Sequence, residues 1–108
     1  MDNARVTLVT GVLLILTGPA VAAPEQMICE NPRREYLVRF DAVAGSFTAG
    51  AEGAPTRYRV RSVQAVSGGW IIKGSTPPPG PDFLAFTYGK KKVEYRMDGK
   101  LIQVDFCR

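Results

Sequence analysis

Short runs in which every second residue is apolar occupy most of the chain after residue 23, and this pattern most constrains the fold. In the clearest run, Tyr36, Val38 and Phe40 lie on one side of an extended segment, and the charged residues of the run lie on the other. Gly, Pro, Asn and Asp separate the runs, as they do in turns between strands. A period of two is typical of half-buried antiparallel strands, whereas a long helix needs a period of 3.6 residues. The sequence therefore predicts an all-β fold.

About seven strands are expected, joined in sequence by short turns as in a β-meander. They cover residues 36–41, 45–49, 56–66, 70–73, 83–88, 93–97 and 101–107. In the longest run the apolar residues change sides past Ser62, which indicates a β-bulge or a bend there. Asp98-Gly99 lies between two alternating runs and predicts a two-residue hairpin turn in which both residues have positive φ.

Only two cysteines occur, Cys29 and Cys107, one near each end of the segment 23–108. In a small domain in an oxidising compartment such a pair is typical of a disulfide, whereas two buried free thiols would suit a cytosolic protein. A disulfide here would close a loop of nearly the whole domain and stabilise it by roughly 4–5 kcal/mol. It would also place the first and last strands side by side. Because a meander must protect its edge strands, we expect a small up-and-down barrel, with a two-sheet sandwich as the alternative.

Residues 1–22 have the layout of a cleavable signal peptide. A short polar start contains Arg5, residues 6–16 are uncharged and mostly apolar, and Ala20-Val21-Ala22 provides small residues for cleavage after Ala22. A membrane-spanning helix needs about 20 apolar residues, and this stretch ends earlier, at Gly18-Pro19, so cleavage is favoured over an uncleaved membrane anchor. We therefore expect a signal peptide (1–22) and a single β-barrel-like domain (23–108) in a periplasmic or secreted protein without a transmembrane anchor.

The chain contains no histidine, which is the usual general base and the commonest metal ligand. Both cysteines are expected in the disulfide, and no loop has the spaced acidic residues of a calcium site. No helix is expected whose start could carry a glycine-rich phosphate-binding loop. The sequence therefore predicts a non-catalytic protein with no metal site and no cofactor.

Four basic residues form a candidate anion-binding site. Arg57, Arg59 and Arg61 lie on one side of the strand 56–66, and Lys73 lies on the next strand. Arg side chains bind phosphate and carboxylate groups in a bidentate manner, so the site would suit lipid headgroups, cell-wall polymers or an acidic protein. The alternative is an ordinary solvated sheet face, whose charges prevent aggregation. The net charge of +4 permits binding to an anionic surface, and no nucleic acid is expected as the partner of an exported protein.

Aromatic residues suggest a second candidate site, a barrel mouth that holds a small apolar ligand. They are Tyr58, Trp70, Phe83, Phe86, Tyr88, Tyr95 and Phe106. The alternative is that they fill the core, as side chains do in small barrels. The proline-rich stretch 77–81 cannot supply ladder hydrogen bonds and is expected to be a rigid loop.

The order of these features resembles the small periplasmic β-barrel inhibitors of c-type lysozyme and is similar to other small exported β-barrel proteins of proteobacteria. The residues that carry the likeness are Cys29-Glu30-Asn31, the strand 36–41 and the terminal Phe106-Cys107. The resemblance implies the barrel and the location. The inhibitory Ser-Gly-x-x-Tyr segment of the family has no match, because the nearest string, residues 67–71, has Ile71 in place of the tyrosine. Lysozymes of that type are strongly basic, and the positive charge of this chain weakens such an encounter.

We therefore expect an exported, non-catalytic binding or interaction protein, with an anionic surface or an extracytoplasmic protein as candidate partners. Two alternatives stay open. One is an inhibitor of a secreted hydrolase such as c-type lysozyme, and the other is a carrier of a small apolar ligand inside the barrel.

Overall fold

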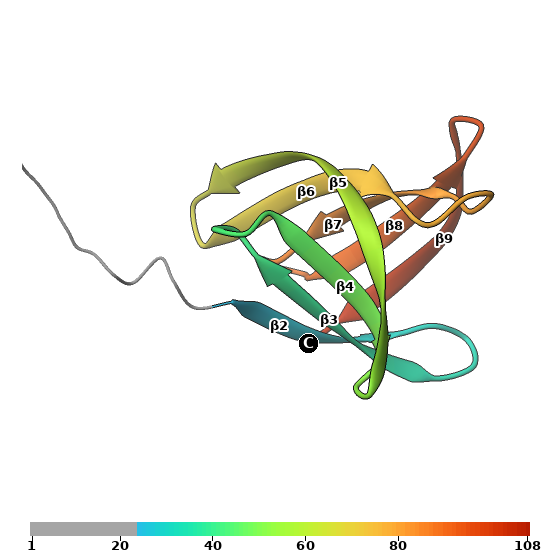
Figure 1. Cartoon of the computed structure of the whole chain (residues 1–108), viewed down its shortest axis with the longest axis horizontal. Helices are drawn as coiled ribbons and strands as arrows, with labels where there is room; N and C mark the ends of the chain where they lie inside the picture. Colours follow the sequence, from blue (N-terminus) through green and yellow to red (C-terminus); the bar gives the residue numbers. More distant parts are fainter. Residues whose placement is uncertain (1–23) are drawn as a thin grey trace, which may run out of the picture.

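The computed structural model of the chain describes residues 24–108, so the predicted signal peptide and its cleavage site lie outside the described residues. In residues 24–108, eight antiparallel strands follow one another in chain order around a closed barrel (Figure 1). The strands are β2 (Glu25–Glu30), β3 (Glu35–Asp41), β4 (Ser46–Ala51), β5 (Ala54–Val66), β6 (Gly69–Ser75), β7 (Asp82–Phe86), β8 (Lys92–Met97) and β9 (Lys100–Cys107). The predicted all-β class and up-and-down barrel are confirmed, and the alternative of a two-sheet sandwich is wrong. No helix in this part of the chain is long and apolar enough to cross a bilayer.

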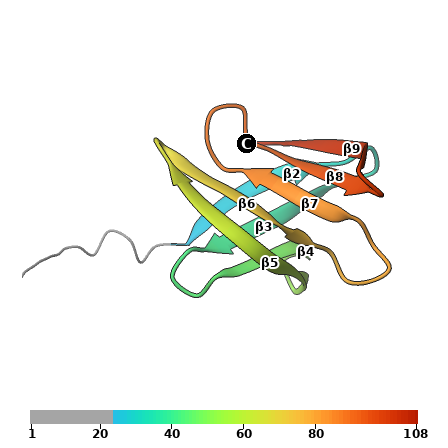
Figure 2. The same cartoon turned by 90° about the horizontal axis from the view of Figure 1, so that it is seen from above.

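The strands are strongly tilted, as closure of a barrel requires. Figure 2 shows β5, β6 and β7 sloping across the view in one direction and β2, β3 and β4 sloping in the other. Alternate residues of the strands point into the barrel, and the predicted inward set of β3 is buried: Tyr36, Val38 and Phe40 are each less than 10% exposed. The core is completed by Phe47, Ile72, Phe83, Ala85 and Val93 from strands β4 and β6 to β8.

Strand β2 was not predicted, although the disulfide had placed Cys29 beside the last strand. It pairs with β3 along its whole length, from Glu25 opposite Phe40 to Glu30 opposite Glu35. Its inward residues Met27 and Cys29 are buried. Two apolar inward positions are too few to produce a recognisable alternation, and the strand owes its structure to its pairing with β3.

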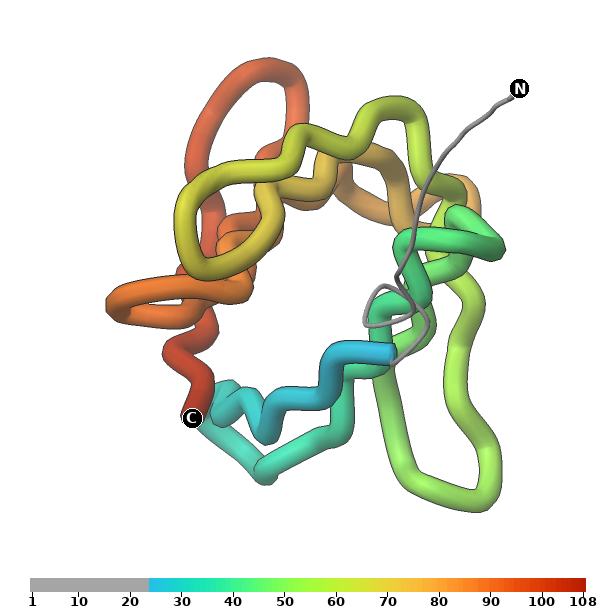
Figure 3. The backbone as a smooth tube through the Cα atoms, turned by 90° about the vertical axis from the view of Figure 1, so that its left-hand side faces the viewer, coloured from blue at the N-terminus to red at the C-terminus, as the bar shows by residue number. Residues whose placement is uncertain are grey.

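The barrel closes along a short seam between β2 and β9. Only Cys29 opposite Cys107 and Glu30 opposite Phe106 pair there, and Ile28 and Arg108 exchange two backbone hydrogen bonds of 2.9 Å. The predicted disulfide joins Cys29 to Cys107 within this seam. Figure 3 shows the C-terminus beside β2, with the other strands completing the ring. Residues of β9 before Asp105 extend past the end of β2 toward the turns at that end of the barrel.

Two local predictions are confirmed. The register of the β5–β6 pair shifts between Val60 and Ser62, which is the bulge expected near Ser62. The hairpin between β8 and β9 turns at Asp98 and Gly99, with φ of 53° and 78°. A second register shift, between Tyr95 and Arg96 of the β8–β9 pair, was not predicted.

Strand β9 presents its apolar residues to the outside. Ile102 is 56% exposed and Phe106 is 62% exposed, whereas Asp105 is 1% exposed and lies inside the barrel. The expectation that Phe106 lines the mouth or fills the core is therefore wrong. The physical reason is that Asp105 finds hydrogen-bond donors inside the barrel, as described below, so the polar side of this strand can face inward.

Candidate functional site: a polar cavity at one end of the barrel

A cavity of about 600 Å³ lies at the end of the barrel that carries the β2–β3, β4–β5 and β6–β7 turns. Its wall is formed by residues of β3, β4, β5, β8 and β9, and the turns form its rim. Among its polar lining residues, five belong to one hydrogen-bonded group: Tyr36, Tyr58, Tyr95, Gln103 and Asp105. We refer to these five residues as the polar cluster.

Strand register brings the polar cluster together from four strands. Tyr36 is the first inward residue of β3, opposite Cys29 on β2. Tyr95 of β8 lies opposite Gln103 of β9, and Asp105 lies opposite Val93 two residues further along the same pair. On the other side of the barrel, Tyr58 of β5 pairs with Phe47 of the neighbouring strand β4. The inward side chains of these distant strands therefore converge on one point.

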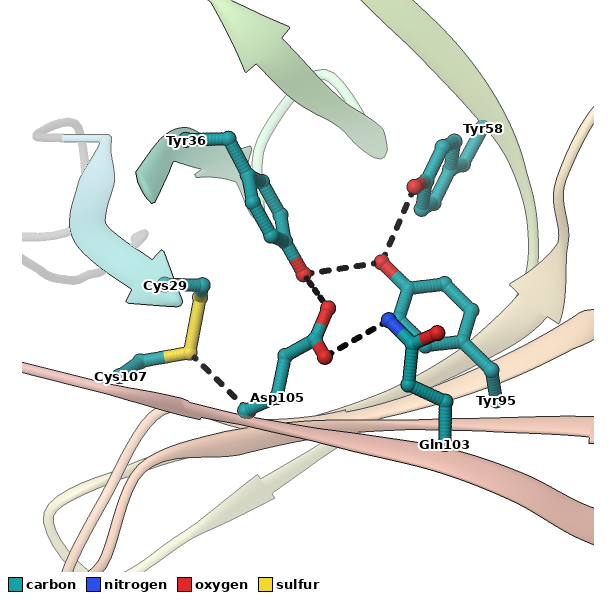
Figure 4. Close-up of a disulfide and its surroundings, with 7 residues drawn as sticks. All are labelled: Cys29, Tyr36, Tyr58, Tyr95, Gln103, Asp105 and Cys107. Carbon is teal, nitrogen blue, oxygen red and sulfur yellow. Dashed lines mark hydrogen bonds between the residues drawn. A yellow bond between two sulfur atoms is a disulfide. The ribbon is translucent and has the colours of Figure 1, made fainter. Parts of the chain in front are cut away.

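The polar cluster is joined by four hydrogen bonds (Figure 4). The Tyr36 hydroxyl donates to Asp105 Oδ2 at 2.5 Å, and Gln103 Nε2 donates to Asp105 Oδ1 at 2.7 Å. The hydroxyl oxygen of Tyr95 lies 3.1 Å from that of Tyr36 and 3.0 Å from that of Tyr58. Asp105 is thus buried with a donor on each carboxylate oxygen, which offsets part of the cost of removing a carboxylate from water.

An aromatic layer supports the polar cluster from the core side. The ring centroids of Phe47 and Phe83 are 4.5 Å apart, and the Tyr58 ring lies 5.0 Å from Phe83 and 5.4 Å from Phe47. The Tyr58 and Tyr95 rings meet edge to face at 6.4 Å. Packed aromatic rings have few alternative positions, so they hold the hydroxyl groups in fixed places at the floor of the cavity.

Burial raises the pKa of all three cluster tyrosines above the ordinary tyrosine value. Desolvation is the main cause in each case, because the phenolate form loses water inside the barrel. For Tyr36, the hydrogen bond to Asp105 raises the pKa further, since the carboxylate needs the hydroxyl proton. The three hydroxyl groups therefore keep their protons at neutral pH and act as hydrogen-bonding groups.

Two of the turns at the rim of the cavity are fixed by their own hydrogen bonds. In the β6–β7 loop, the backbone N–H and the hydroxyl of Thr76 both donate to the carbonyl of Pro81, at 2.9 and 2.7 Å. The prediction that residues 77–81 form a loop is confirmed. In the β2–β3 turn, Asn31 Oδ1 accepts the backbone N–H groups of Arg33 and Arg34 at 2.8 and 2.9 Å.

The predicted anion-binding residues lie elsewhere, on the outside of β5 and β6. Arg57, Arg59, Arg61 and Lys73 are all exposed, and none of them lines the cavity. Lys73 lies opposite Ser62 across the β5–β6 pair, and Arg61 lies 3.5 Å from the carboxylate of Asp82. The four exposed side chains do not converge on an enclosed site. Their role in binding anions stays a prediction.

The predicted aromatic set is divided by the structure. Tyr58 and Tyr95 line the cavity, Phe83 is core, and Trp70 packs against the core. Phe86 lies under the ammonium of Lys92, 5.3 Å from Nζ to the ring centroid, and meets Tyr88 edge to face.

Sequence reasoning missed Tyr36, Gln103 and Asp105 as residues of the site. Tyr36 was predicted only as an inward residue, and Asp105 was taken as one of many scattered carboxylates. The available signal was the alternation in β9, where Gln103 and Asp105 share a side with Cys107, a residue that the disulfide ties to an inward cysteine.

The chain was compared with models of protein families, with curated proteins and with solved structures, and none of the three comparisons gave a match. The resemblance to lysozyme inhibitors therefore rests on the order of features in the sequence. The structure shows its coarser part, a small eight-stranded antiparallel β-barrel.

Proposed function

We propose that this protein is a non-catalytic binding protein that takes up a small organic ligand at the open end of its barrel. The single observation that carries the proposal is the cavity of about 600 Å³ with the polar cluster on its floor and wall. Small-molecule sites typically have volumes of about 300–1,000 Å³, apolar walls and a few well-placed polar groups.

The wall has the mixed character that such sites need. The rings of the cluster tyrosines, Ala49 and Pro77 provide apolar surface, and the hydroxyl, amide and carboxylate groups of the polar cluster provide orientation. A ligand that combines an apolar body with a polar group fits this wall better than a purely apolar one. The carrier alternative drawn from the sequence is thereby refined to an amphipathic ligand.

We place the protein outside the cytoplasm as part of the same proposal. The Cys29–Cys107 disulfide supports this location, because structural disulfides persist in oxidising compartments and are rare in the cytosol. The sequence of residues 1–22, with its apolar stretch and small-residue cleavage site, supports export through a signal peptide.

Native mass spectrometry tests the proposal directly. The protein, purified with its disulfide intact, is incubated with a small-molecule extract of its host, desalted and sprayed under native conditions. We expect a bound mass that is released on denaturation. Ala51→Trp is expected to lose it, because Ala51 lines the cavity at the end of β4 and an indole there occupies the space that the ligand needs.

Ala44→Trp is the matched control. Ala44 is an exposed alanine in the β3–β4 turn, at the opposite end of the barrel. The Ala44→Trp variant should retain the bound mass. No bound mass in the wild type, or the same bound mass in Ala51→Trp, would contradict the proposal.

A further inference from the structure

The hydroxyl protons of the polar cluster have a single consistent arrangement. Tyr36 donates its only hydroxyl proton to Asp105, so in its contact with Tyr95 it must accept. Tyr95 has then used its proton on Tyr36, so it must accept from Tyr58. All three protons point along one chain, from Tyr58 through Tyr95 and Tyr36 to the carboxylate of Asp105 (Figure 4).

This order leaves the cavity wall rich in acceptors. The Tyr58 oxygen gives its proton to Tyr95 and receives none from the described residues, so its lone pairs are free. Each oxygen of Asp105 accepts one hydrogen bond and has room for another. Gln103 contributes its amide oxygen as a further acceptor. The remaining amide N–H of Gln103 is the one donor that the polar cluster has to spare.

The carboxylate of Asp105 also lacks a cation. Within residues 24–108 the ion pairs closer than 4.0 Å join Arg61 to Asp82, Lys92 and Arg96 to Glu94, and Arg108 to Glu35, and none includes Asp105. Among the described residues, the one basic side chain that lines the cavity is Arg34, which is exposed at the rim. A buried carboxylate surrounded by neutral donors is only partly compensated, and a cationic partner would complete its environment.

We infer that the ligand carries a protonated amine or amidinium group, which enters the cavity and binds to the polar cluster with the Asp105 carboxylate as its counter-charge. This inference rests on the proposed function and specifies the class of ligand. An ammonium group has donors only, so it matches free acceptors on Tyr58, Gln103 and Asp105. The faces of the tyrosine rings attract the same charge. Gln103 and Asp105 both line the cavity, so a group that enters it can reach them.

Probes that share a ring and a two-carbon linker but differ in the charge of the end group test this inference. Phenethylamine, phenethyl alcohol and hydrocinnamate, and the same three groups on a cyclohexyl ring, are titrated into the protein and followed by the NMR shifts of the tyrosine rings. We expect the amines to bind at least about tenfold more tightly than the alcohols and carboxylates with the same ring and linker, since a hydrogen bond to a charged group contributes about 1.5–3 kcal/mol.

Asp105→Asn removes the charge and preserves the shape. Tyr36 can still donate to the remaining amide oxygen, and the Gln103 amide can turn so that its oxygen accepts from the new NH2 group, so the fold is expected to persist. The preference for amines should disappear in Asp105→Asn and should weaken in Tyr58→Phe, which removes a free acceptor without changing any charge. Equal or tighter binding of the carboxylates, or a preference for amines that survives in Asp105→Asn, overturns the inference.

The host ligand separates this inference from the proposed function. A bound mass from the extract that contains a basic nitrogen supports both. A bound mass without one overturns the charge inference and leaves the proposed function standing, whereas no bound mass overturns the proposed function itself.

Discussion

Asp105 is the residue whose buried position is hardest to explain from the local sequence. It is 1% exposed, and its two oxygens are satisfied by Tyr36 and Gln103. Tyr36 is 69 residues away in the chain, and Tyr95 and Tyr58 extend the same network from two further strands. A buried acidic residue is tolerated only where such donors exist, so these residues form one unit.

The buried tyrosines predict how the protein responds to alkali. In a Tyr88→Phe background, Tyr36, Tyr58 and Tyr95 supply all tyrosinate absorbance, because the chain has four tyrosines. Their folded pKa values are raised, so above pH about 10 the unfolded chain loses these protons while the folded chain keeps them. The free energy of unfolding therefore falls as the pH rises above this value, by up to about 1.4 kcal/mol per pH unit for each tyrosine.

The measurement follows tyrosinate absorbance and far-ultraviolet circular dichroism through the same alkaline titration. We expect the two signals to change together, in one cooperative step. Tyrosinate that appears near the ordinary tyrosine pKa while the circular dichroism stays native would show that the three hydroxyls are not buried as described.

At the scale of elements, turns and bulges decide which residues face inward. The bulge between Val60 and Ser62 lets Tyr58 and Val60 face inward in the first half of β5 and brings Val63 opposite the buried Ile72 in the second half. The shift between Tyr95 and Arg96 gives β9 an extra residue and sets Gln103 beside Tyr95. The end of β9 that carries Gln103 and Asp105 thereby becomes a wall of the cavity.

The β8–β9 hairpin predicts a difference between two glycines. Gly99 has φ of 78°, whereas Gly53 of the β4–β5 turn has no positive φ, and open space surrounds the Cβ position of both. Gly99→Ala should cost about 1–2 kcal/mol, because an L-residue is strained in the left-handed region. Gly53→Ala should change stability by less than about 0.5 kcal/mol. Urea unfolding followed by fluorescence of the single tryptophan measures both, and equal effects would contradict the turn geometry.

In the barrel as a whole, the disulfide lies between the two neighbouring strands that have the fewest paired residues. The β2–β9 seam has two paired positions, supported by an exposed ion pair of 2.7 Å between Arg108 and Glu35, which also lowers the pKa of the Glu35 carboxyl. Exposed pairs contribute little. The bond between Cys29 and Cys107 therefore does most to keep the ring closed, and closure holds the polar cluster together.

Removal of the disulfide is expected to be severe. The bond joins residues separated by 78 positions, and a loop of this length corresponds to about 4 kcal/mol of stabilisation. Cys29→Ala/Cys107→Ala should lose about that much stability, a large part of what a domain of this size has. Urea unfolding of the variant, with reduced wild type as the control, measures the loss. Unchanged midpoints in both would show that the seam is stable without the bond.

The sequence by itself determined the structural features that depend on residues close together in the chain or on the number of cysteines. Alternation of apolar residues predicted the strands other than β2, and Asp98-Gly99 predicted a hairpin. The change of sides past Ser62 predicted a bulge, and two cysteines at the ends of the domain indicated the disulfide. Each follows from backbone preferences or side-chain periodicity over a few residues, or from cysteine count.

Only the tertiary structure decided the pairing of β2 and the inward side of β9. Period-two alternation defines two sides of a strand but does not say which one is buried when partners for a polar side exist elsewhere. In β9 one of the two donors for Asp105 is Tyr36, on a strand far away in the chain, and Phe106 is left outside as a result. The cavity exists because distant strands meet, which no local pattern records.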